Sequence, residues 1–267
     1  MLPKRVQFRI SLGTLLVAVA LAVSACTGSA NAPTKESKSP APFGIRDKPQ
    51  SPPIPRQPTL AQPLDVQIVG KGFSQIPPDF TGTSYRTYAV VIRNPNPETW
   101  IADGVELNLT FTDASGKVVD SFVDIIDAIL PGQSAAATPL AGIGSGEKVA
   151  SQLQVQPHVE RWEQTPPSLG RFIVSEITTV PKDFGIEMMT RATIHSSFYK
   201  DVKQANAAAV YYDSEGNIVG GASTSVDCIP ANGDAELGVS ADLKLDTIAK
   251  TEIYVQLTRQ ALLDMAK

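Results

Sequence analysis

The sequence predicts an all-β protein in which two copies of one antiparallel sandwich follow an apolar N-terminal segment and a proline-rich stretch. Three observations support this prediction: a repeat with an offset of 100 residues, short segments in which apolar and polar residues alternate, and an apolar run that ends at a cysteine. Helical periodicity is confined to residues 259–265. The expected order is a signal segment at 1–25, a tether at 26–63, a first sandwich at 64–157, a linker at 158–170 and a second sandwich at 171–267, which ends in the short helix.

The first 26 residues have the organisation of a secretory signal. Basic residues come first, namely Lys4, Arg5 and Arg9. An apolar run at 10–23 follows, and small residues then lead to Ala25 and Cys26. The pattern predicts cleavage between Ala25 and Cys26. Two alternatives stay open: an ordinary signal cut after Ala30, and a retained membrane helix, although a span needs about 20 apolar residues.

Residues 23–26, Val-Ser-Ala-Cys, resemble the lipobox of bacterial lipoproteins. The resemblance implies a diacylglyceryl group on the sulfur of Cys26 and often a further acyl chain, such as palmitate, on the new amine. Two or more chains anchor a protein stably, whereas one holds it only reversibly. The expected location is therefore the cell membrane, with the chain lipid-anchored on the extracytoplasmic face, at the cell surface or in a periplasm.

The tether at 26–63 is rich in proline, serine, threonine and lysine. Its prolines are Pro33, Pro40, Pro42, Pro49, Pro52, Pro53, Pro55, Pro58 and Pro63. Such a composition cannot bury a core, so we expect a disordered, partly polyproline II spacer. At about 3.1 Å per residue, residues 27–63 reach on the order of 110 Å at most. A proline-recognition role for 52–55 is the alternative to a plain spacer.

Charge and cysteine content narrow the function classes. The chain has 23 basic and 27 acidic residues, and the signal segment holds three of the basic ones, so cleavage leaves 20 against 27. This acidic balance disfavours a nucleic-acid partner, which needs a basic surface. With Cys26 acylated only Cys228 remains, so no intrachain disulfide can form and the core must stabilise the exported domains.

An internal repeat divides the remainder of the chain. Three pairs of segments align at one offset, 110–119 with 210–219, 126–129 with 226–229, and 152–156 with 252–256. The Asp-x-x-Gly sequences at 113–116 and 213–216 are typical of hairpin turns, because Asp accepts turn amides and Gly adopts the positive φ that ends the turn. Two copies of one fold are the simplest interpretation. Pro166, Pro167 and Gly170 interrupt the pattern between them.

Alternation of apolar and polar residues, as in 105–111 and 251–257, indicates strands with one buried face. The expected strands of the first unit are 65–69, 88–93, 105–111, 121–126, 134–140 and 149–155. Those of the second are 172–178, 188–196, 207–212, 222–227, 235–239 and 251–257. Short strands separated by turn residues predict antiparallel sandwiches.

These residues resemble the FxLYD domain. The match is Phe111-Thr112-Asp113, then Gly116, Val118-Val119 and Leu130-Pro131-Gly132, with Tyr211-Tyr212-Asp213, Gly216 and Ile218-Val219 in the second copy. The signature departs at 109–112, and the Pro-Gly pair is broken in the second unit. The resemblance implies an immunoglobulin-like β-sandwich of the kind found in bacterial surface lipoproteins, and it carries no catalytic residue.

No motif indicates catalysis, a metal or a cofactor. His158, placed in the linker, and His195 have no further ligand at metal-binding spacing. The glycine-rich segment 142–146 lacks the Lys-Ser/Thr ending of a phosphate loop and is interpreted as a flexible loop.

Four other features have two interpretations each. Asp120, Asp124 and Asp127 are either calcium ligands or charges that keep an edge or outer face soluble and block edge pairing. Cys228 aligns with an alanine and is expected to be small and buried, the alternative being a reactive thiol. We expect Trp162 to pack between the two units and Trp100 to pack in a core or an interface. Sugar or partner binding is the alternative for both tryptophans.

The function expected from these features is a non-enzymatic, membrane-anchored lipoprotein. Its two sandwich modules bind or scaffold an unidentified cell-envelope protein or polymer. The alternative is an accessory factor for envelope assembly or transport that holds a small or apolar ligand between its two domains.

Overall fold

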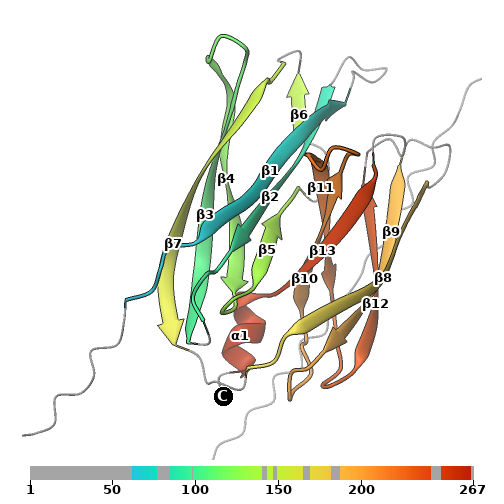
Figure 1. Ribbon diagram of the computed structural model, residues 1–267. Coiled ribbons are helices and arrows are strands. Elements are labelled where there is room, and N and C mark those ends of the chain that lie inside the picture. The colour runs from blue at the N-terminus through green and yellow to red at the C-terminus, as the bar shows by residue number, and fades with distance from the viewer. Residues whose placement is uncertain are drawn as a thin grey trace, which may run out of the picture. The chain divides into compact units, whose positions relative to one another are not determined.

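The computed structural model describes residues 62–76, 84–97, 99–139, 143–146, 149–164, 169–181, 187–241 and 248–265. Contacts separate an N-terminal segment, Met1–Gln57, from the body of the chain, Pro58–Lys267, and all described residues belong to that body. The signal segment, Cys26 and nearly all of the tether therefore lie outside the described residues. In the described part every paired strand is antiparallel, so the predicted all-β fold is confirmed (Figure 1).

The first sandwich consists of two sheets. One has the order β1-β2-β5, with β6 also paired to β2, and the other has the order β4-β3-β7. The bounds are β1 Gln67–Ile76, β2 Ser84–Arg93, β3 Trp100–Thr112, β4 Val118–Ile129, β5 Ser134–Ala137, β6 Ile143–Gly146 and β7 Gln152–Gln164. Their inner faces enclose an apolar core that includes Tyr88, Leu107, Phe111 and Ile126.

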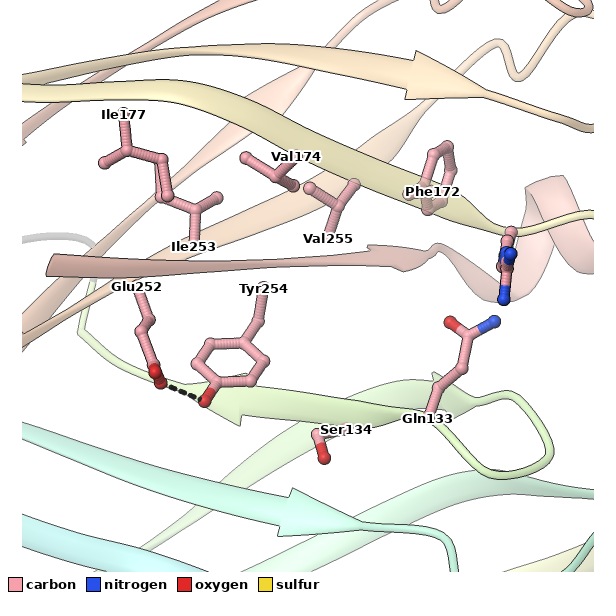
Figure 2. Close-up of a pocket in the computed structure, with 10 residues that line it drawn as sticks. Gln133, Ser134, Phe172, Val174, Ile177, Glu252, Ile253, Tyr254 and Val255 are labelled. Atoms are coloured by element: carbon pink, nitrogen blue, oxygen red, sulfur yellow. Dashed lines mark hydrogen bonds between the residues drawn. The ribbon is translucent and has the colours of Figure 1, made fainter.

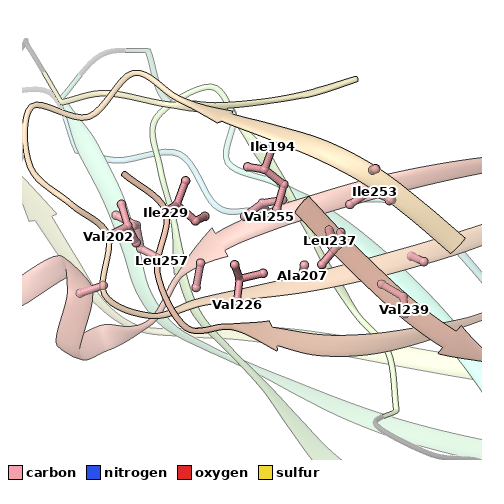
Figure 3. Close-up of a cluster of buried hydrophobic side chains, with 14 of the residues drawn as sticks. Ile194, Val202, Ala207, Val226, Ile229, Leu237, Val239, Ile253, Val255 and Leu257 are labelled. Carbon is pink, nitrogen blue, oxygen red and sulfur yellow. The ribbon is translucent and has the colours of Figure 1, made fainter. Parts of the chain in front are cut away.

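The second sandwich repeats this arrangement. Its sheets have the orders β8-β9-β12 and β11-β10-β13. The bounds are β8 Phe172–Pro181, β9 Met188–Ser196, β10 Ala205–Tyr212, β11 Ile218–Val226, β12 Asp234–Ala241 and β13 Lys250–Leu257, followed by helix α1 at Arg259–Met265. Figure 3 shows the core of this unit, where Ile194, Leu237 and Val255 from three strands meet.

Strand pairing is the same in both units, as the sequence repeat predicts. In each, the first, second and fifth strands form one sheet, while the third pairs with the fourth and with the last. This matches strands A-B-E and C′-C-F of an immunoglobulin sandwich. The hairpin turns are also confirmed: the amide of Gly116 donates to Asp113 O at 3.0 Å, and Gly216 donates to Asp213 O at 3.1 Å.

Two segments differ from the sequence prediction. Residues 143–146, expected in a flexible loop, form strand β6 because their backbone pairs with β2. Strand β7 continues to Gln164, so residues 158–164 of the expected linker pair with β3, and His158 lies in this strand. Trp162 also lies in β7 and packs against the core of the first sandwich. Its predicted position between the units is wrong, because the strand that carries it continues past Pro157.

The two sandwiches contact each other through sheet faces. Strand β2 is buried on both sides: Tyr88, Val90 and Ile92 point into the first core, while Ala89 and Val91 pack against the second unit. The opposing residues on the second unit are Ala208, Val210 and Ile218. We call this contact, with Ala136, the intersheet contact.

Glycines allow a close approach at the intersheet contact. A Cβ on Gly72 of β1 would lie 2.0 Å from the backbone oxygen of Ile218, and one on Gly221 of β11 would lie 2.3 Å from the Thr138 side chain. The hydroxyl of Thr87 donates to Gly221 O at 2.6 Å and accepts from Gly221 N at 3.1 Å. The Thr87 hydroxyl and the backbone groups of Gly221 are thereby satisfied inside this apolar contact.

The equivalent faces of the other two sheets are mixed, with polar residues beside the exposed Val123, Ile125 and Ile173. Ala136 of β5 corresponds to Glu236 of β12 by the 100-residue offset, and Ala208 of β10 corresponds to Asn108 of β3. Asn108 and Glu236 are exposed. An amide and a carboxylate side chain thus replace two of the alanines of the intersheet contact at these positions.

A buried carboxylate joins the C-terminal helix to the first sandwich. Asp103 of β3 is 1% exposed and pairs with Arg161 of β7 and with Nε of Arg259, the first residue of α1, at 3.1 Å. Arg259 also donates to Glu160 at 2.5 Å. The paired arginines satisfy a charge that would be costly to bury alone.

Candidate binding groove

An open groove of about 450 Å³ runs along one side of the second sandwich. Strands β8 and β13 supply most of its lining, and Arg171 before β8, Gln133 in the β4–β5 turn and Ser134 at the start of β5 complete it. Figure 2 shows the apolar wall, where Val174 and Ile177 of β8 lie close to Val255 and Ile253 of β13. Glu252 and Tyr254 point to the opposite side of β13, toward β5. The groove is thus apolar along β8 and polar along the border with the first sandwich.

The strand at the base of the groove has a free edge within the described part of the chain. Strand β13 is the last strand of its sheet and pairs only with β10. All eight residues keep one regular register, from Lys250 opposite Tyr212 to Leu257 opposite Ala205. A regular edge strand presents backbone donors and acceptors that can pair with another strand.

A β-bulge directs Ile177 into the groove. The register of β8 with β9 shifts between Ser175 and Thr178, and Glu176 within the bulge has φ 55°. Phe172 and Val174 are two residues apart and both line the groove. The extra residue of the bulge places Ile177, three residues after Val174, on the same face of β8. Left-handed φ costs a non-glycine residue roughly 1 kcal/mol or more. The Thr193 hydroxyl donates to Glu176 Oε2 at 2.9 Å and holds the bulge in place. Bulges of this kind re-aim side chains beside functional sites.

Glu252 is the centre of a polar cluster on the groove border. Its Oε2 accepts from the hydroxyls of Tyr212 at 2.7 Å and Tyr254 at 2.6 Å, and its Oε1 accepts from Lys250 Nζ at 2.6 Å. Burial raises the pKa of Glu252, but the hydrogen bonds from Lys250, Tyr254 and Tyr212 outweigh it, so the pKa lies below its usual value. The carboxylate is therefore ionised at neutral pH.

The two tyrosines are held in the neutral form. Burial, followed by the hydrogen bond to Glu252, raises the pKa of Tyr212 to about 12. Burial and Glu252 also raise the pKa of Tyr254. Both hydroxyls donate to one carboxylate, so they fix the side chains that form this wall of the groove.

Arg171 supplies a positive charge at the end of the groove marked by Phe172. The side chain is exposed, and no described residue forms an ion pair with its guanidinium. Its backbone is fixed, because its amide donates to Ser197 Oγ at 2.9 Å and its carbonyl accepts from Ser197 N at 3.0 Å. A fixed backbone beside a free guanidinium suits recognition of an acidic group.

The acidic residues of β4 lie on the edge strand of their sheet, but two of them have buried partners. Asp120 and Asp124 lie on the core-facing side of the strand. Asp120 accepts from Arg86 at 3.3 Å, and Asp124 accepts from the Tyr88 hydroxyl at 2.6 Å. Asp127, on the other face, accepts from Asn206 of the second sandwich at 3.3 Å. The edge position agrees with the prediction, but the outer-face interpretation is wrong for the first two, because they are partners of the buried Arg86 and Tyr88.

Arg86 explains why Asp120 lies on the core-facing side of β4. The side chain is 1% exposed, and its guanidinium lies 4.5 Å from the centre of the Phe111 ring. Burial lowers the pKa of Arg86, and Asp120 opposes that shift. A buried guanidinium requires a nearby anion, which Asp120 provides.

The remaining candidate residues are spread over the structure. Nδ1 of His195 lies 2.7 Å from Asp234, and both side chains are exposed. Trp100 begins β3 and is half-buried.

Cys228 is exposed, so the expectation of burial is wrong. Cys228 lies in the connection between β11 and β12, because β11 ends at Val226. Its counterpart Ala128 lies inside β4 and is buried. Among the described residues, no group of three or more His, Cys, Asp or Glu is placed to hold a metal ion.

Sequence reasoning missed the groove and the intersheet contact. The available signal for the contact was the uninterrupted apolar run 88–92, since a strand buried on both faces loses its alternation. A search of family models found no match for the chain, and a search of curated proteins found none either.

Proposed function

We propose that the protein is a lipid-anchored extracytoplasmic lipoprotein whose two-sandwich unit binds a cell-envelope protein through the groove along β13. The sequence supports the anchor through the lipobox-like segment that ends at Cys26 and through the proline-rich tether that follows. Among the described residues, no helix has the length and apolarity needed to cross a membrane.

The observation that carries the binding role is the groove itself. An apolar wall from β8, a strand edge that no described strand covers and an Arg171 without an ion pair among the described residues together suit a polypeptide better than a compact small molecule. Extended peptides bind such edges through main-chain hydrogen bonds and place alternate side chains in pockets.

The structure weighs against the alternative of a carrier that encloses a ligand between its domains. Alanine, valine and isoleucine side chains fill the intersheet contact, and hydrogen bonds from Thr87 cross it. The groove borders both sandwiches but is open. Polar groups on its border, such as Glu252, are already satisfied by their neighbours.

The anchor is tested by replacing Cys26. Cys26→Ser is expected to abolish labelling by a fatty-acid analogue and to release the protein from the membrane fraction. Cys228→Ser is the matched control, because it removes the other cysteine and is expected to leave labelling unchanged. Retained labelling in Cys26→Ser would refute the anchor.

The binding role is tested by crosslinking on intact cells. We expect the full-length protein to capture one envelope protein reproducibly, and we expect Ile177→Lys, which introduces a charge into the groove, to reduce that capture. Capture of the same partner at equal yield by Ile177→Lys would place binding elsewhere on the unit. A tightly bound small molecule detected by native mass spectrometry would favour the carrier.

A further inference from the structure

The groove occupies the place of a strand that the immunoglobulin sandwich has and the described part of this chain lacks. The sheet β11-β10-β13 corresponds to C′-C-F, and in immunoglobulin domains strand G pairs with the outer edge of F. Here the chain leaves β13 at Leu257 and turns into α1, with Thr258 Oγ1 accepting from Ala261 N at 3.2 Å. Helix α1 packs in the core through Ala261, Leu262 and Met265 rather than along the edge of β13.

The two strands beside this position differ in their ability to accept a partner. The bulge at Glu176 interrupts the edge of β8, which is a common means of blocking strand addition. Strand β13 has no register shift along its whole length. A strand added in the groove would therefore extend the sheet of β13, while β8 would contact its side chains.

The lining defines the chemistry of the occupant. Phe172, Val174 and Ile177 lie along one wall, so an added strand needs apolar side chains at every second residue on that face. Its other face meets Tyr254 and Gln133, which suit polar side chains. The guanidinium of Arg171, which is exposed and forms no ion pair with a described residue, favours an acidic residue at that end.

We infer that the groove accepts an extended segment of another protein as a fourth strand on β13, with alternating apolar residues and an acidic residue beside Arg171. Pairing is antiparallel, as it is for every strand pair in the described residues. Because β13 runs from Lys250 toward the Arg171 end, the acidic residue lies at the start of the segment. This inference rests on the proposed function and specifies the mode of binding.

The test uses the full mature chain and a fluorescent peptide, acetyl-Glu-Val-Thr-Val-Thr-Val-Thr-amide. We expect saturable binding by fluorescence polarisation, together with slower amide hydrogen exchange in β13. A peptide N-methylated on the backbone amides that face β13 keeps its side chains but cannot form the ladder, and it is expected to bind at least about tenfold more weakly. Equal binding of the two peptides, or exchange protection located elsewhere, would overturn the inference.

Two matched pairs of variants localise the site. Ile177→Lys is expected to weaken peptide binding by at least about tenfold, because it places a charge on the apolar wall. Ile173→Lys changes the same residue type on the same strand, 47% exposed against 37% for Ile177 but outside the groove lining, and is expected to stay within about twofold. Arg171→Gln should weaken binding of this peptide but not of its Gln-initiated analogue, whereas Arg191→Gln on the outer face of β9 should affect neither.

Failure of this inference and failure of the proposed function give different results. If Ile177→Lys still captures the envelope partner on cells and the peptide does not bind, strand addition is wrong while the lipoprotein and its binding role stand. If the peptide binds but no envelope protein is captured by the anchored chain, the strand-accepting groove stands and the proposed partner class is wrong.

Discussion

Gly72→Ala tests whether the two sandwiches pack as closely as the intersheet contact requires. The new Cβ would lie 2.0 Å from the backbone oxygen of Ile218 and 2.8 Å from its carbonyl carbon. An ordinary carbon–oxygen contact needs about 3.2 Å or more, so β1 and β11 must separate by roughly 1 Å. Such a gap forfeits about half of the dispersion attraction between the facing atoms. We expect a destabilisation of about 2–3 kcal/mol, within the range for overpacking.

Gly70→Ala provides the matched control. Gly70 lies on the same strand, and its Cβ would meet only the end of the Ile218 side chain, at 3.0 Å. That flexible end can rotate away, and replacing glycine also reduces the entropy of the unfolded chain. We expect a change of no more than about 0.5 kcal/mol in the free energy of unfolding.

The assay is urea unfolding of both variants and the parent protein, followed by tryptophan fluorescence and circular dichroism. A lower midpoint at unchanged slope for Gly72→Ala reports a loss of stability alone. If Gly72→Ala is no less stable than Gly70→Ala, the sheets do not approach each other as described, and the reasoning on the intersheet contact is refuted.

Two further predictions concern buried polar groups. Asp120→Ala is expected to lower the free energy of unfolding by about 2 kcal/mol in the parent protein, because it leaves Arg86 buried without its anion. In an Arg86→Met background the same substitution should cost close to nothing. Equal costs in both backgrounds, measured by urea unfolding, would contradict the pairing. The raised pKa of Tyr212 means that the folded state retains its phenolic proton where the unfolded chain loses it, so this contribution to stability is complete below pH 10 and is lost as pH rises toward about 12. Tyr212→Phe should therefore show a shallower alkaline decline in unfolding midpoint than the parent, and identical declines would argue against the interaction with Glu252.

Local chemistry was sufficient to predict the strands and their turns. The alternation at 105–111 separates an inner face, with Leu107 and Leu109 buried, from an outer face that carries Asn108. Asp113 Oδ1 accepts from the amides of Ser115 and Lys117, as the Asp-x-x-Gly pattern predicts. These features depend on neighbouring residues, so a sequence pattern can report them. The anchor at Cys26 stays a prediction.

Contacts between distant residues were not predictable in the same way. Arg86 and Asp120 are both charged, and each alone indicates an exposed position, yet their pairing places them at the margin of the core. The groove depends on an edge of β13 that no described strand covers and on a bulge that re-aims Ile177, and neither leaves a periodic signal. Cys228 illustrates the same limit, since alignment with a buried alanine did not identify the end of the strand.

The intersheet contact also determines how the protein would transmit force. The tether joins the first sandwich, where the amide of Leu64 donates to Asn96 at 2.6 Å, whereas most of the groove belongs to the second. If the chain is anchored and bound as proposed, tension between the membrane and the partner crosses the glycine- and alanine-lined boundary, where the hydrogen bonds of Thr87 and Ser223 resist sliding. Separating the halves would expose an apolar sheet on each of them, so the pair bears mechanical load as one body.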